Sequence, residues 1–221
     1  MKSSLKKSAA QWLLSGFTAF TLTFSLAGCS QTAEENPELE KTTDASLVEP
    51  AEYVPASAEG PAQNVPEPRL PFNATERSEE GAVATLNYFW EAAQYLRLTG
   101  DAGPLSFVSS DTCDFCTTFI GDWQDAYNSR YWAAPVGDVE LSVTDSWAGD
   151  EEENLNSVDV LFSISEPEVT VYDKDGQEQD TAPGDTSQDK REWFAVLSFD
   201  ATAQQWVVEW IGLEELVTWE E

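Results

Sequence analysis

The chain has 221 residues, with 41 acidic against 11 basic side chains, a formal net charge of −30 and no histidine. Such a charge repels polyanions, and without a basic surface there is nothing to release counterions, so nucleic-acid binding is excluded. The absence of histidine excludes Ser-His-Asp and Cys-His nucleophilic schemes and the commonest zinc sites. Any catalysis would therefore depend on carboxylates, tyrosines or cysteines.

The first 28 residues have the pattern of an export signal. Three early lysines precede a short apolar stretch that ends in Leu26-Ala27-Gly28, directly before Cys29. A basic start, an apolar stretch and small residues before a cleavage point are typical of secretory signals. The placement of Cys29 resembles the lipobox of bacterial lipoproteins, in which this thiol receives a diacylglyceryl group. We therefore expect residues 1–28 to be removed, and Cys29 to anchor the mature chain in the cell membrane on its extracytoplasmic face.

Two other interpretations of this leader remain open, a plain signal peptide and an uncleaved transmembrane anchor. The anchor is disfavoured because serine, threonine and glycine interrupt the apolar stretch from Trp12 to Ala27. That stretch is also short for a span, which needs about 20 apolar residues. The lipoprotein interpretation is the one favoured here.

Residues 29–75 have the composition of a disordered tether. Most of the chain's eleven prolines lie between Pro37 and Pro71, mixed with glutamate, alanine, serine and threonine. Such a segment buries too little apolar surface to offset the entropy lost on ordering. We expect an acidic, proline-rich tether that holds a domain away from the membrane. A segment that folds on a partner is the alternative.

Two helices open the predicted domain, residues 76–221. The first follows Ser78, a suitable N-cap, carries an apolar stripe at spacings of four and three, and ends at Gly100. The second is expected from about Thr112 to Tyr131, after Asp111 as its cap.

The rest of the domain alternates apolar and polar residues, which predicts strands with one wet face. Four strands are expected, near residues 139–144, 157–165, 193–199 and 206–211. Residues 169–172 would extend the second strand past Pro167, which marks a bulge or a bend. Short turns between such strands indicate an antiparallel meander. The predicted class is therefore α+β, with N-terminal helices packed on a curved antiparallel sheet of about four strands.

Helices followed by tryptophan-rich strands resemble the cone-shaped fold of cystatin-like and nuclear transport factor two-like proteins. More narrowly, the chain resembles an actinobacterial lipoprotein family known only as domain of unknown function 6318. The residues that carry this resemblance are the lipobox, Thr99-Gly100-Asp101, Pro104-Leu105 and Cys113-Asp114-Phe115-Cys116. It implies the cone fold and an extracytoplasmic location, and it transfers no activity.

Cys113 and Cys116 are the two cysteines that remain in the domain. Outside the cytoplasm such a pair is expected to be oxidised, and the small loop it closes would fix the start of the second helix. The alternative is a thioredoxin-type dithiol, whose first cysteine lies at a helix N-terminus with a lowered pKa. The preceding helix, the antiparallel strands and the acidic Asp114 weigh against redox chemistry. We expect a structural disulfide.

Two acidic loops raise the question of calcium binding. Asp150-Glu151-Glu152-Glu153 lies between two expected strands, and Asp173-Lys174-Asp175-Gly176 lies at an expected hairpin. The second begins like a calcium loop, but Gln177 occupies the next ligand position and the glutamate spacing does not fit. Asp-Gly is also a common pair in tight turns. Solvated turns are the favoured interpretation, and we expect no metal and no cofactor.

Aromatic side chains on the helices and strands could line an apolar pocket inside a cone fold. The residues proposed for such a lining are Tyr88, Tyr95, Trp123, Tyr127, Trp193 and Trp206. The alternative is that these side chains fill the core of a small domain. We expect a domain that binds an envelope protein or a small apolar ligand without catalysis. A carboxylate-dependent enzyme, with Asp145 or Asp159 beside Tyr88, and a thiol oxidoreductase are the competing hypotheses.

Overall fold

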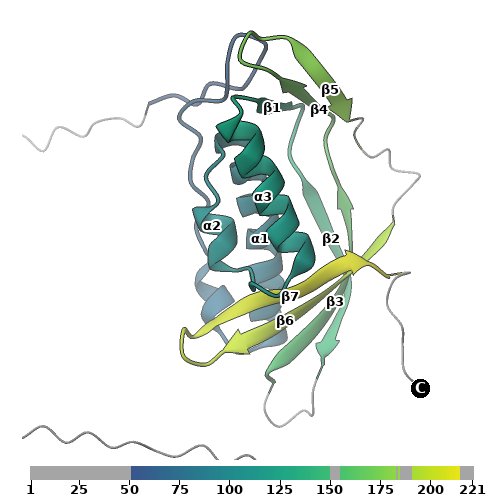
Figure 1. Ribbon diagram of the computed structural model, residues 1–221. Helices are drawn as coiled ribbons and strands as arrows, with labels where there is room; N and C mark the ends of the chain where they lie inside the picture. Colours follow the sequence, from purple (N-terminus) through teal and green to yellow (C-terminus); the bar gives the residue numbers. More distant parts are fainter. Residues whose placement is uncertain (1–50, 150–154, 183, 185–190, 215–221) are drawn as a thin grey trace, which may run out of the picture. The chain divides into compact units, whose positions relative to one another are not determined.

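A long helix, α1 (Glu79–Thr99), packs against the other helices and against antiparallel strands in the computed structural model (Figure 1). The structure describes residues 51–149, 155–182, 184 and 191–214, which all belong to the unit Val48–Glu221. The export signal and Cys29 lie outside the described residues. Within the described part of the chain, no helix combines the length and the apolar character that crossing a bilayer requires.

The helices are η1 (Phe72–Thr75), α1 (Glu79–Thr99), α2 (Gly103–Phe107) and α3 (Asp114–Asn128). The predicted ends of α1 are confirmed: the Ser78 hydroxyl accepts a hydrogen bond from the Gly81 amide, and Gly100 adopts the left-handed conformation with φ 74°. The predicted cap of the second helix is wrong. Cys113 caps α3 in place of Asp111, since its Sγ accepts a hydrogen bond from the Cys116 amide at 3.2 Å.

The strands form two antiparallel sheets instead of the single sheet expected. The four-stranded sheet has the order β2-β3-β6-β7, and the three-stranded sheet has the order β1-β4-β5. The strands of the first are β2 (Glu140–Ala148), β3 (Ser157–Ser165), β6 (Glu192–Asp200) and β7 (Gln205–Leu213). Those of the second are β1 (Trp132–Pro135), β4 (Val169–Tyr172) and β5 (Glu178–Ala182).

The segment after Pro167 explains the difference. It was expected to extend β3, but β3 ends at Ser165 and β4 pairs with β1 through Val169 and Pro135. Proline has no amide hydrogen to donate to a ladder, so Pro167 separates two strands and allows the chain to change sheets. The α+β class is confirmed, with the strands divided over two sheets.

The core lies between the helices and the four-stranded sheet. Strand β3 alternates as predicted: Val158, Val160 and Phe162 are fully buried, and the residues between them are half-buried. An aromatic cluster fills the same space, because Trp90 of α1 has ring contacts with Phe162 and Trp193 of the sheet at centroid distances of 6.4 and 6.2 Å. Aromatic side chains therefore occupy the interior that could otherwise have been a cavity.

The segment before α1 corrects the predicted domain boundary. The prediction of a disordered tether is wrong for residues 51–75, whose backbone forms bridges between Val54 and Gln63 and between Ser57 and Gly60. The Trp132 indole N–H donates to the Ser57 carbonyl at 2.8 Å, which attaches this segment to β1. A prediction from composition considers only the apolar surface that a segment can bury by itself. This segment instead lies against the surface of the domain. Residues 51–71 are called the strap below.

Trp206 of β7 fixes the beginning of α1. Its ring is fully buried, and its indole N–H donates to the Glu76 carbonyl at 2.8 Å. Gly81 lies directly beside this hydrogen bond: a Cβ atom at position 81 would lie 2.1 Å from the Glu76 oxygen and 3.0 Å from the indole nitrogen. The sheet and the helix can approach this closely only because residue 81 has no side chain.

Gly81→Ala is therefore expected to destabilise the fold by more than about 1 kcal/mol, because the new methyl group must displace backbone in a filled core. Gly121→Ala is the matched control, since α3 leaves open space around a Cβ at position 121. There the change should stabilise the protein by about 0.5–1 kcal/mol through helix propensity. Urea unfolding of both variants measures the change in the free energy of unfolding. Changes of the same sign in the two variants would contradict this account of Gly81.

Candidate functional site

A cavity of about 610 Å³ lies between the strap, the outer face of α1 and the beginning of β2. Its volume falls in the range of small-molecule sites, about 300–1,000 Å³. The strap contributes Tyr53, Val65, Pro66, Glu67 and Pro68; α1 contributes Asn87, Trp90, Glu91, Gln94, Tyr95 and Leu98; Asp138, Val139 and Leu141 come from the start of β2. This cavity is called the strap pocket below.

The α1 wall of the strap pocket follows from helical spacing. Asn87, Glu91, Gln94 and Leu98 recur at intervals of four, three and four, so they share one face of the helix. The sequence assigns this face to solvent because it is polar, and indeed the core lies on other faces of α1. The strap lies opposite this face across the cavity, and Glu91 stays exposed. Val65 and two prolines supply apolar surface opposite the polar helix face.

Two polar atoms of pocket-lining residues have no hydrogen-bond partner within the described part of the chain. They are the indole Nε1 of Trp90, a donor, and the amide Oε1 of Gln94, an acceptor. The other end of the Gln94 amide donates to the Gly137 carbonyl at 3.4 Å, which sets the orientation of the group. Buried polar atoms are normally paired, so these two atoms are exceptions among the lining residues.

The electrostatics of the strap pocket are negative. Three carboxylates line it, Glu67, Glu91 and Asp138, and no lysine or arginine does. The pKa of Tyr88, just behind the wall, is raised by burial and then by the charges of Glu67 and Glu91. The pKa of Tyr95 in the wall is likewise raised, by burial first and then by Asp101 and Glu67. The field of Glu67 therefore reaches both phenols and opposes negative charge there.

The six aromatic residues proposed for a pocket lining are not brought together. Only Tyr95 of this group lies in the wall of the strap pocket. Tyr88 and Trp206 are buried at 5% and 0% exposure. Trp193 belongs to the aromatic cluster, stacked on Phe162.

The remaining two of these residues lie on α3. The ring of Trp123 contacts that of Phe119, with their centroids 6.5 Å apart. Tyr127 donates through its hydroxyl to the Arg97 carbonyl at 2.9 Å, and burial raises its pKa above the usual range. The six side chains therefore line no common pocket: Tyr88 and Trp206 are core residues, and Tyr95 lines the strap pocket.

The carboxylates suggested for catalysis do not meet Tyr88. Asp159 lies on the face of β3 opposite the fully buried Val158 and Val160, away from α1. Its pKa is raised by burial and lowered in part by a hydrogen bond with Trp147. Asp145 is exposed on β2, opposite Leu161. No acid–base pair of these residues is assembled.

Cys113 and Cys116 form a disulfide at the start of α3. Both residues are fully buried, and Cys113 also caps the helix through its sulfur. Thiol exchange requires an accessible sulfur, so this burial favours a structural role.

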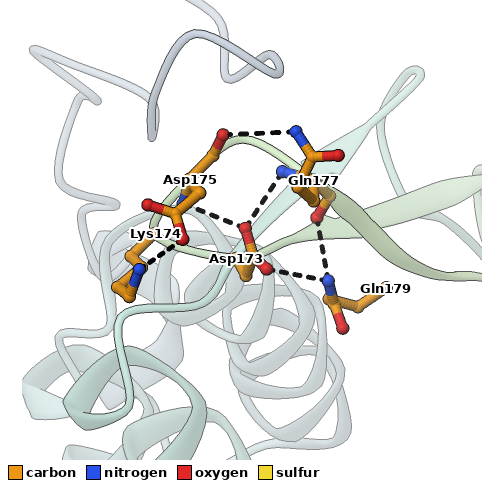
Figure 2. A network of polar contacts seen from close by, with 5 residues as sticks. All are labelled: Asp173, Lys174, Asp175, Gln177 and Gln179. Atoms are coloured by element: carbon orange, nitrogen blue, oxygen red, sulfur yellow. Dashed lines mark hydrogen bonds and ion pairs between the residues drawn. The ribbon is translucent and has the colours of Figure 1, made fainter.

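The hairpin between β4 and β5 carries the acidic loop that begins like a calcium site (Figure 2). Asp173 Oδ1 accepts hydrogen bonds from the backbone amides of Asp175 and Gln177, and its Oδ2 accepts one from the Gln179 side chain. Lys174 pairs with Asp175. The oxygens of Asp173 thus organise a turn. Among the described residues there is no group of three or more potential metal ligands, and residues 150–153, the second acidic loop, lie outside them.

Comparison with known proteins gives a family without an assigned function. Residues 51–210 match the model of a family of unknown function (DUF6318), and the chain belongs to that family. The match begins where the described strap begins. No curated protein matches the chain.

Among solved structures, the intermembrane space region of the chloroplast protein ARC6 matches with a TM-score of 0.44 and 9% identity. The alignment covers 62% of this chain and 95% of that one. A likeness this low carries no argument about function.

Replacing both cysteines by alanine is expected to lower the free energy of unfolding by about 2 kcal/mol, the loop-closure value for so short a loop. The strap pocket should be unaffected, because neither cysteine lines it. Urea unfolding measures the loss, and ligand titration of the double variant checks the pocket. A loss of ligand binding in a folded double variant would contradict a purely structural disulfide.

Proposed function

We propose that this protein is a lipid-anchored lipoprotein of the extracytoplasmic membrane face whose domain binds a small, largely apolar ligand in the strap pocket without catalysis. The observation that carries the proposal is the cavity of about 610 Å³, with aromatic and aliphatic walls and two unpartnered polar atoms in its lining residues. Sites of this kind enclose a ligand with apolar surface and orient it with a few polar groups.

The proposal includes the cone-shaped fold of nuclear transport factor two-like proteins. Its support is the order of elements, with α1 and α3 before an antiparallel meander, and the packing of both helices against the four-stranded sheet. In this version of the fold the interior is filled and the ligand site lies outside α1, beneath the strap. The strap, instead of the walls of an open cone, therefore encloses the ligand site.

Binding is favoured over the two catalytic alternatives. Glu67, Glu91 and Asp138 are exposed, and within the described ranges none of them has a side-chain hydrogen bond or an ion pair that would orient it as a general acid or base. The only disulfide of the described residues is buried, which disfavours a thiol oxidoreductase. An envelope protein remains the competing partner.

The lipid anchor is tested by metabolic labelling: a bacterial host that produces the full chain is grown with radioactive palmitate. We expect the label on the wild-type chain, and a mature mass that corresponds to cleavage before Cys29. Cys29→Ser should abolish the label, whereas the Cys113→Ala, Cys116→Ala double variant should retain it. Labelling of Cys29→Ser, or none of the wild type, would refute lipidation at this residue.

The pocket is tested with N-phenyl-1-naphthylamine, a neutral apolar dye that fluoresces when it leaves water. We expect saturable binding of one equivalent by the full chain. Val65→Trp, which places a large ring in the pocket from the strap, should weaken binding at least about tenfold, since an occupied cavity has lost its apolar contact surface.

Val136→Trp is the matched control for this titration, because Val136 is 72% exposed and lies outside the lining. Its affinity should equal that of the wild type. Equal dye binding by both variants would place the binding site elsewhere, for instance in the apolar leader, and would overturn the proposed function.

A further inference from the structure

We propose that the strap pocket selects a cationic amphiphile, a ligand that carries an organic ammonium group on an apolar body. This inference rests on the binding function proposed above and names the chemical class of the ligand. It follows from the way in which charge, aromatic rings and an unpartnered acceptor are combined in one cavity. Each of the three contributes separately.

Uncompensated charge is the first contribution. Glu67 comes from the strap, Glu91 from α1 and Asp138 from the chain before β2, so three separate segments place a carboxylate at the same cavity. The ion pairs found among the described residues, Arg97–Glu166 and Lys174–Asp175, use none of them. The residues that line the cavity therefore carry three negative charges and no basic side chain.

Aromatic rings are the second contribution. Tyr53 and Tyr95 line the same cavity as the carboxylates, whereas Trp90, also a lining residue, is 3% exposed and its ring belongs to the core cluster. The face of an aromatic ring attracts a cation within about 6 Å of its centroid, and the attraction grows when water is excluded. Acidic residues are abundant throughout this chain, and Glu67, Glu91 and Asp138 are themselves exposed. The combination with rings in a cavity is what distinguishes this group of carboxylates from the rest of the surface.

The Gln94 side chain is the third contribution. Its Oε1 atom is buried and unpartnered, and as a carbonyl oxygen it can only accept a hydrogen bond. A primary or secondary ammonium group would supply the missing donor. The Trp90 N–H, also unpartnered, would in turn suit an acceptor such as a hydroxyl or carbonyl oxygen on the same ligand.

The same arrangement disfavours anionic ligands. Fatty acids and phospholipids with a net negative charge would bring that charge close to the carboxylates of Glu67, Glu91 and Asp138, which repel it. The raised pKa values of Tyr88 and Tyr95 are consistent with this field. Among ligands with an apolar body, the pocket would therefore prefer cations to neutral molecules and anions.

A matched pair of probes tests the charge selection on the full chain: benzyltrimethylammonium and neopentylbenzene, in which carbon replaces the charged nitrogen. Benzylammonium, which has N–H donors, tests the Gln94 acceptor. Phenylacetate is the anionic member of the set. Each probe is titrated by displacement of N-phenyl-1-naphthylamine and, for the charged probes, by calorimetry. We expect the cation to bind at least about tenfold more tightly than its neutral isostere, and the anion more weakly than both.

Glu67→Gln combined with Glu91→Gln should remove most of the advantage of the cation and leave the affinity for the neutral probe unchanged. Glu192→Gln, an exposed strand residue outside the pocket, is the control for a general change of charge. Raising the salt concentration from about 0.05 to 0.5 M should weaken binding of the cation alone.

The outcomes separate this inference from the function on which it rests. If the dye and the neutral probe bind in the pocket and the cation has no advantage, the charge selection is wrong and the binding function stands. If Glu192→Gln reduces cation binding as much as the double variant does, the effect is one of net charge and the inference is again overturned. If neither dye nor any probe distinguishes the wild type from Val65→Trp, both proposals fail.

Discussion

The close contact between Trp206 and the start of α1 is the constraint on which the structure depends. A fully buried indole bonds to the Glu76 carbonyl at 2.8 Å, and Gly81 leaves the space for it. This contact ties the last strand of the sheet to the first long helix, across more than half of the chain. Since α1 also contacts β1, β2, α2 and α3, its position determines where every other described helix and both sheets can lie.

A helix held in this way is buried on most of its circumference, and its polar face then serves a purpose other than solubility. Leu86, Phe89 and Ala93 face the core. Asn87, Glu91 and Gln94 belong to the α1 wall of the strap pocket. The strap lies opposite these residues without supplying partners for all of their polar atoms. A cavity whose apolar and acidic lining comes from three segments is the result, and α1 provides one of its walls.

The helices and most strands could be predicted because their signals are local. Ser78 and Gly100 delimit α1, and the alternation around Phe162 marks β3. The strap could not be predicted in this way, since its order comes from contacts with residues far away in sequence, such as the bond from Trp132 to Ser57. The pocket was missed for the same reason: a polar helix face looks solvent-exposed until a distant segment lies opposite it. Of the aromatic residues taken as pocket lining, Tyr88 and Trp206 are core instead, because a small domain must fill its interior before it can enclose a ligand.

The strap also links the pocket to the proposed anchor, because the chain that leads back to Cys29 continues directly from it. One wall of the pocket belongs to the strap and the opposite wall to α1, so a ligand held between them stabilises the docking of the strap on the domain. A net charge of −30 by itself would push an unoccupied acidic strap away from an acidic helix face. A cationic ligand removes part of that repulsion at the point where Glu67 and Glu91 approach the same cavity, and so acts on the contact that closes the site around it.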